Sequence, residues 1–137
     1  MNIDSIIWPT NGRTAINLYL NFLIKVIEIL GLDFSSSDHS NPLAITKSYI
    51  SGNLSEEKYR ATANVWWGYL DDNNATRDLK NKDALMVRLS ICLLSVTLDE
   101  VDELGEHLSW FFEVLEQLGI NLNKPIAMMS EYFKFNS

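Results

Sequence analysis

The chain has 137 residues, a length typical of one domain, and 47% of its residues are hydrophobic while 21% are charged. This composition excludes a globally disordered chain. The 18 acidic residues outnumber the 11 basic ones and give a net charge of −7. Such a charge disfavours direct binding to nucleic acid or to anionic membranes, because both need lysine and arginine. The single cysteine, Cys92, excludes an internal disulfide and favours a reducing compartment.

The N-terminal part of the chain lacks the features of a targeting or membrane segment. No basic region precedes an apolar run, and the longest uncharged run there, 14–24, is shorter than the ~20 residues of a membrane span. We therefore expect a cytoplasmic protein without a membrane-spanning helix. The same run begins the first predicted helix, 14–30, which is apolar on two faces and so is expected to be central.

Helix boundaries are indicated by capping residues along the chain. Asn41-Pro42 is typical of an N-cap followed by the first helical residue, and Ser55 precedes another helix. Gly31 and Gly119 each follow a long apolar run, as glycines at helix C-termini do. Thr97 and Glu100 have the spacing of a capping box. The pattern predicts an all-α fold, a single domain over 1–137 with five to seven helices, near 14–30, 42–51, 55–71, 83–96, 98–118 and 124–134.

Buried aromatic and charged groups are expected in the middle of the chain. Trp66 and Trp67 lie on the apolar stripe of the helix at 55–71, so we interpret both as core residues. The helix at 83–96 is apolar around its whole circumference, and after its first turn Arg88 is its one charge. A buried arginine needs a partner, and Asp71 or Asp72 is the predicted one. We assign structural roles to Trp66, Trp67, Asp71 and Arg88.

The sequence carries no catalytic or cofactor motif that we recognise: a phosphate-binding glycine loop, a zinc-binding helix and a nucleophile elbow are all absent. Cys92 lies in the most apolar helix, where a thiol is an inert hydrophobic group. His107 follows Glu103 at helical spacing, but two ligands make no metal site, and a solvated helix border explains them better. We therefore predict no enzymatic activity, no cofactor and no metal. An enzyme with an unmarked pocket near Trp66, Trp67 and Arg88 is kept as an alternative.

Acidic residues are segregated in the last third of the chain. The segment 89–123 has no lysine or arginine and contains seven acids. On one continuous helix, most of these acids share a stripe with Trp110, opposite the leucine and phenylalanine face. An aromatic residue ringed by carboxylates is typical of a site for a basic protein. The predicted partner-binding residues are Asp99, Asp102, Glu103, Glu106, Trp110 and Glu113. The alternative is a merely solvated face, and Gly105 could interrupt the helix.

Two segments resemble a known class of proteins. Residues 59–72, YRATANVWWGYLDD, followed by 84–94, ALMVRLSICLL, are similar to small helical bacterial immunity proteins, including those that protect against contact-dependent growth inhibition toxins. The resemblance implies an acidic domain encoded beside a toxin gene. Members of the class bind the toxin's C-terminal domain, often a nuclease, and block its active site. The resemblance assigns no residue of this chain a role in binding.

The resemblance and the charge pattern lead to one functional hypothesis. We expect an immunity protein that binds a cognate bacterial toxin domain, a basic nuclease, and occludes its active cleft with an acidic surface. A small helical adaptor or regulatory subunit that binds another basic protein is the alternative. Nearby genes would separate the two, because a toxin gene immediately upstream favours immunity.

Overall fold

The computed structural model describes residues 3–32, 41–72 and 82–135, with the backbone alone described at 69–72 and 82–83. The predicted all-α fold is confirmed. Within the described residues the only β-type pairing is one antiparallel bridge, between Ile6 and Phe135. The elements are η1 (Ile3–Ser5), α1 (Gly12–Leu30), α2 (Pro42–Ile50), α3 (Glu56–Asp72), α4 (Lys82–Leu94), η2 (Leu98–Glu103), α5 (Leu104–Gln117) and α6 (Asn123–Tyr132), where η denotes a 3-10 helix.

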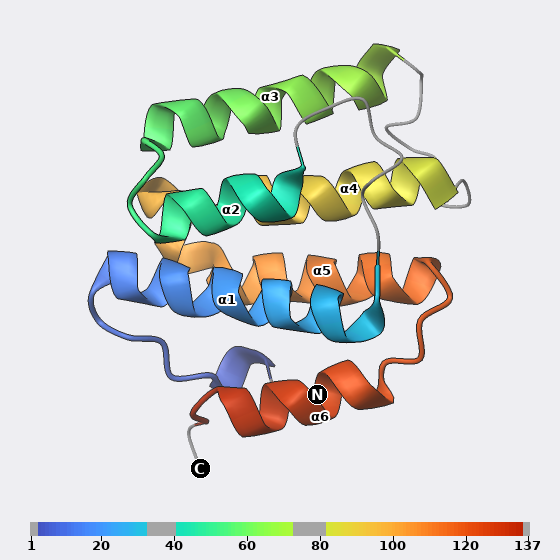
Figure 1. Ribbon diagram of the computed structural model, residues 1–137. Helices are drawn as coiled ribbons and strands as arrows, with labels where there is room; N and C mark the ends of the chain where they lie inside the picture. The colour runs from blue at the N-terminus through green and yellow to red at the C-terminus, as the bar shows by residue number, and fades with distance from the viewer. Residues whose placement is uncertain (1–2, 33–40, 73–81, 136–137) are drawn as a thin grey trace.

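The helices stack in layers around α1 and α4 (Figure 1). Helix α4 contacts α1, α2, α3 and α5, while α1 also contacts α2, α5 and α6. Every described side chain of α4 except Met86 is buried, and α1 contributes nine buried residues. The prediction that these two helices form the centre is therefore confirmed. None of the helices in the described ranges combines the length and the apolar character that crossing a membrane requires.

Most of the predicted caps are present. The Asn41 side chain accepts from the backbone N–H of Leu43 at 2.9 Å and marks the start of α2. The Ser55 hydroxyl accepts from the N–H of Lys58 at 3.2 Å at the start of α3. Gly31 follows α1 with a φ of 68°, a left-handed conformation that glycine adopts at little cost. These local signals explain why the observed ends of α1, α2 and α3 lie close to the predicted ones.

A buried polar cluster fixes the C-terminal end of α4 against α2 and α3. The Tyr59 hydroxyl donates to the carbonyl of Leu93 at 2.5 Å, and the Thr46 hydroxyl donates to the same carbonyl at 3.2 Å. The Tyr59 oxygen also accepts from the N–H of Val96 at 3.4 Å. Carbonyls in the last turn of a helix lack a partner within the helix, so these bonds satisfy one of them. The cluster holds the segment 95–97 at the base of the candidate site.

The structural residues predicted from the sequence are only partly confirmed. Trp66 is 2% exposed and Arg88 is 8% exposed, so both are buried as expected. Trp67 is 38% exposed, and its assignment to the core was wrong. The reason is geometric, because successive residues of a helix point about 100° apart and only Trp66 can face α4. The side chains of Asp71 and Asp72 lie outside the described part of the chain, so their pairing with Arg88 stays a prediction.

Candidate partner-binding site

The acidic segment is not the single helix that the sequence predicted. Residues 98–103 form the 3-10 helix η2, and the α-helix begins only at Leu104. The apolar residues Leu98, Val101 and Leu104 recur every third position, which matches the three residues per turn of a 3-10 helix. A Cβ placed on Gly12 would lie 3.3 Å from Leu98 Cδ2 and 3.7 Å from Val101 Cγ2, so η2 packs closely on the start of α1.

The expected capping box at the start of this segment is not formed. Thr97 has no side-chain capping bond, and its hydroxyl instead accepts from the Arg60 guanidinium at 3.1 Å. The Glu100 side chain turns away from Thr97 and meets His107 Nε2 at 3.0 Å. Both capping groups are therefore used in contacts between elements, which connect η2 to α3 and α5.

The predicted acidic stripe is exposed but divided. Asp99, Asp102, Glu103, Glu106 and Glu113 are all exposed. Asp99 does not share a free face with the others, because its carboxylate accepts from Arg60 of α3 at 2.6 Å. The segment 89–123 contains no lysine or arginine, but the fold therefore places Arg60 beside it. The remaining acids of η2 and of the first turn of α5 make no ion pair with lysine or arginine among the described residues.

Trp110 is placed differently from the expectation. We predicted an indole with no core to join, but the side chain is half-buried and packs against the edge of the hydrophobic core. Helices α4 and α5 are in contact, and Leu94 at the end of α4 lines the same pocket as the indole, together with the following Ser95. One part of the indole thus packs on the core while the rest stays accessible, as in aromatic anchors at protein interfaces.

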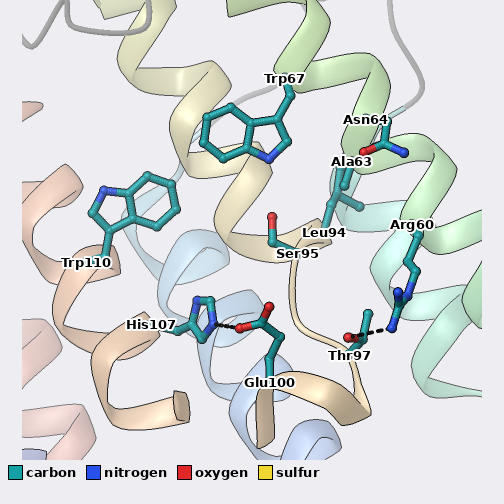
Figure 2. Close-up of a pocket in the computed structure, with 10 residues that line it drawn as sticks. All are labelled: Arg60, Ala63, Asn64, Trp67, Leu94, Ser95, Thr97, Glu100, His107 and Trp110. Carbon is teal, nitrogen blue, oxygen red and sulfur yellow. Dashed lines mark hydrogen bonds and ion pairs between the residues drawn. The ribbon is translucent and has the colours of Figure 1, made fainter.

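A pocket of about 440 Å³ lies between α3, the end of α4, η2 and α5. Figure 2 shows the indoles of Trp67 and Trp110 at one end of it and Arg60 at the other. Its lining residues are Arg60, Ala63, Asn64, Trp67, Leu94, Ser95, Thr97, Glu100, His107 and Trp110. The pocket therefore adds Arg60, Trp67, Glu100 and His107 to the predicted surface residue Trp110.

Three titratable side chains lie close together beside this pocket: Glu100, Glu103 and His107. The hydrogen bond with His107 is the main cause that lowers the pKa of Glu100 below its ordinary value. The hydrogen bond with Glu100, together with the charge of that carboxylate, raises the pKa of Glu103. Possible metal-ligating atoms of the three groups lie within 4.8 Å of one another. Because the groups satisfy one another by hydrogen bonds, their arrangement needs no ion, and we assign none.

The raised pKa of Glu103 gives a stability prediction. In the folded protein ionised Glu103 is disfavoured at neutral pH, and this penalty disappears below the ordinary carboxyl pKa of about 4.3. The substitution Glu103→Gln should therefore raise the melting temperature slightly at pH 7 and leave it unchanged near pH 3. Thermal unfolding followed by circular dichroism across this range measures the difference. Glu113→Gln, an exposed change on α5 outside the cluster, is the control. A lower melting temperature of Glu103→Gln at pH 7 would contradict the prediction.

The hydroxyl and thiol groups of this region are not arranged for nucleophilic catalysis. Ser95 Oγ donates to the carbonyl of Ile91 at 2.6 Å, and Thr97 is bound to Arg60, so neither is paired with His107. Burial raises the pKa of the Cys92 thiol and keeps it protonated. Of the three residues expected near an unmarked enzymatic pocket, only Trp67 lines the described one.

The sequence did not assign four of the pocket residues to the site: Arg60, Trp67, Glu100 and His107. Arg60 lies 39 positions before Asp99, and no periodic pattern links the two. Trp67 was assigned to the wrong face of its helix. No family model, no curated protein and no solved structure matches this chain.

Proposed function

We propose that the protein is an immunity-type inhibitor that binds a basic toxin domain, a nuclease, in the cytoplasm and occludes its active cleft. The single observation behind the proposal is the exposed acidic surface of η2 and α5, which borders a pocket with two tryptophans. Arg60 is the one lysine or arginine that lines this pocket among the described residues, and Asp99 pairs with it. The surface therefore presents negative charge together with aromatic anchors.

The physics of nuclease inhibition supports this choice. A nuclease cleft is cationic because its substrate is a polyanion, and carboxylates can take the place of the phosphates. Complementary charge accelerates encounter between the two proteins. Tryptophan is enriched among the residues that contribute most to interface affinity. An inhibitor of this kind needs no catalytic group, cofactor or metal, and none is part of the proposal.

Charge reversal tests the proposal once a partner is found by affinity capture from the native host or by co-expression with a neighbouring toxin. The double substitution Glu103→Lys with Glu106→Lys raises the net charge by four units, from −7 to −3. We expect association at least about tenfold slower in low salt, because it loses electrostatic steering. The difference should shrink as salt rises, since the screening length falls to about 8 Å at physiological ionic strength.

A matched control separates local steering from net charge. Glu28→Lys with Glu131→Lys changes the charge equally on α1 and α6, and both residues are exposed. Stopped-flow or surface-based kinetics would measure both variants against wild type. Equal association rates for the two double variants would contradict a local acidic interface. Capture of a basic partner that is not a toxin would favour the adaptor alternative instead.

A further inference from the structure

We infer that the pocket between α3 and α5 is a receptor for one arginine side chain of the partner, which would lie against Trp67 and Trp110 with its guanidinium near Glu100. This inference rests on the proposed function, since it specifies how the acidic surface holds its basic partner. The site lies at residues that the charge pattern alone does not single out, and its ligand is a guanidinium group. The pocket determines which side chain of the partner binds there, and it does not determine which protein the partner is.

The indoles form the aromatic part of the receptor. Trp67 projects from α3 and Trp110 from α5, and both line the pocket (Figure 2). The exposed fraction of Trp67 is large for a tryptophan beside a core, so its ring face has area left to cover. A cation over an indole face is attracted by the ring's electron density, and tryptophan is the strongest of the aromatic residues in this respect.

The charges around the pocket select a cation over an anion. Arg60 occupies the end away from the indoles, and its charge is offset by Asp99 at 2.6 Å. Glu100 lies beside His107, and its lowered pKa keeps the carboxylate ionised at neutral pH. A carboxylate can accept about four hydrogen bonds, so the bonds with His107 and Glu103 leave capacity for a guanidinium. Glu103 and Glu106 add two exposed carboxylates close in sequence.

Arginine fits this chemistry better than lysine. The guanidinium is planar and weakly hydrated, so it stacks on aromatic rings while it donates to a carboxylate in its own plane. The ammonium of lysine is compact and strongly hydrated, and it cannot do both at once. A pocket of about 440 Å³ lies in the usual size range of small-ligand sites, so one side chain with its stem can enter.

The test uses the full chain and a defined probe. N-acetyl-arginine amide would be titrated at neutral pH while NMR follows the indole N–H signals of the four tryptophans. We expect saturable shifts for Trp67 and Trp110 and none for Trp8, which packs on Tyr19 and Phe133. N-acetyl-citrulline amide has nearly the same shape without the charge and should give no saturable shift at the same concentrations. Equal shifts with citrulline, or none with arginine, would overturn the inference.

Variants connect the probe to the named residues. Trp67→Ala and Glu100→Gln should each raise the dissociation constant of the arginine probe by about threefold or more. Val65→Ala, a change on the same helix at a side chain that is 51% exposed, should leave it unchanged. Unchanged affinity in both site variants would also overturn the inference. Binding of a basic partner without binding of the probe would refute the arginine site and keep the proposed function. Binding of the probe without binding of a basic partner would keep the arginine site and refute the proposed function.

Discussion

The substitution Phe22→Ala is expected to lower the free energy of unfolding by about 3–5 kcal/mol, the range for deletion of a buried aromatic ring. Phe22 is fully buried on α1. Its ring centroid lies 4.9 Å from that of Phe133, 5.2 Å from that of Tyr132 and 6.4 Å from that of Phe112. The side chain therefore connects α1 with α5 and with the end of α6. Urea unfolding followed by circular dichroism at 25 °C measures the loss.

A second substitution on the same helix serves as the control. Ile29 is 44% exposed on α1, so Ile29→Ala should change the free energy of unfolding by no more than about 0.5 kcal/mol. Domains of this size are stable by about 5–15 kcal/mol, so Phe22→Ala removes a large share of the total. A loss below about 1 kcal/mol for Phe22→Ala would show that the aromatic contacts between α1, α5 and α6 are not those described.

The fold could be predicted from the sequence because its determinants are local. The apolar periodicity of α1 and the almost wholly apolar α4 follow from spacing within each helix. Asn41 and Gly31 mark helix ends through bonds to residues three or four positions away. The start of α1 lies slightly before the predicted one: α1 begins at Gly12, where the Asn11 side chain accepts from the N–H of Thr14 at 3.0 Å. That signal was present in the sequence and can be recognised by the same rule.

The site was harder to predict because its contacts join distant segments. The sequence located the acidic residues and Trp110, but it could not show that Arg60 from α3 pairs with Asp99. The same contact draws the Thr97 hydroxyl away from the cap that local spacing predicted. Whether Trp66 or Trp67 faces the core depends on the rotation of α3 about its axis relative to α4. The apolar stripe predicted from the sequence contains both residues, so it cannot decide between them. A pocket formed between α3, α4, η2 and α5 is visible only after these elements have packed.

The second large effect is expected at the proposed binding site, where Trp110→Ala should lower the affinity for the partner. If the half-buried indole is an anchor of the interface, its removal should weaken partner binding by about 2 kcal/mol or more, which is roughly 30-fold in affinity. The loss should appear mainly as faster dissociation, because packing contacts form after encounter, whereas charge reversal at Glu103 and Glu106 should mainly slow association. Surface-based kinetics with the captured partner measure both rates.

The controls for Trp110→Ala separate binding from folding. Because the indole also packs on the core, the variant's melting temperature must be measured, and its rate constants refer to the folded fraction. Ile7→Ala removes an exposed apolar side chain beside Lys134, at the C-terminal end of the chain, and should leave both rates unchanged. Wild-type dissociation of folded Trp110→Ala would show that the pocket is not the anchor, whatever the charge variants do. Faster dissociation with unchanged association would assign affinity to the tryptophan and encounter to the acids around it.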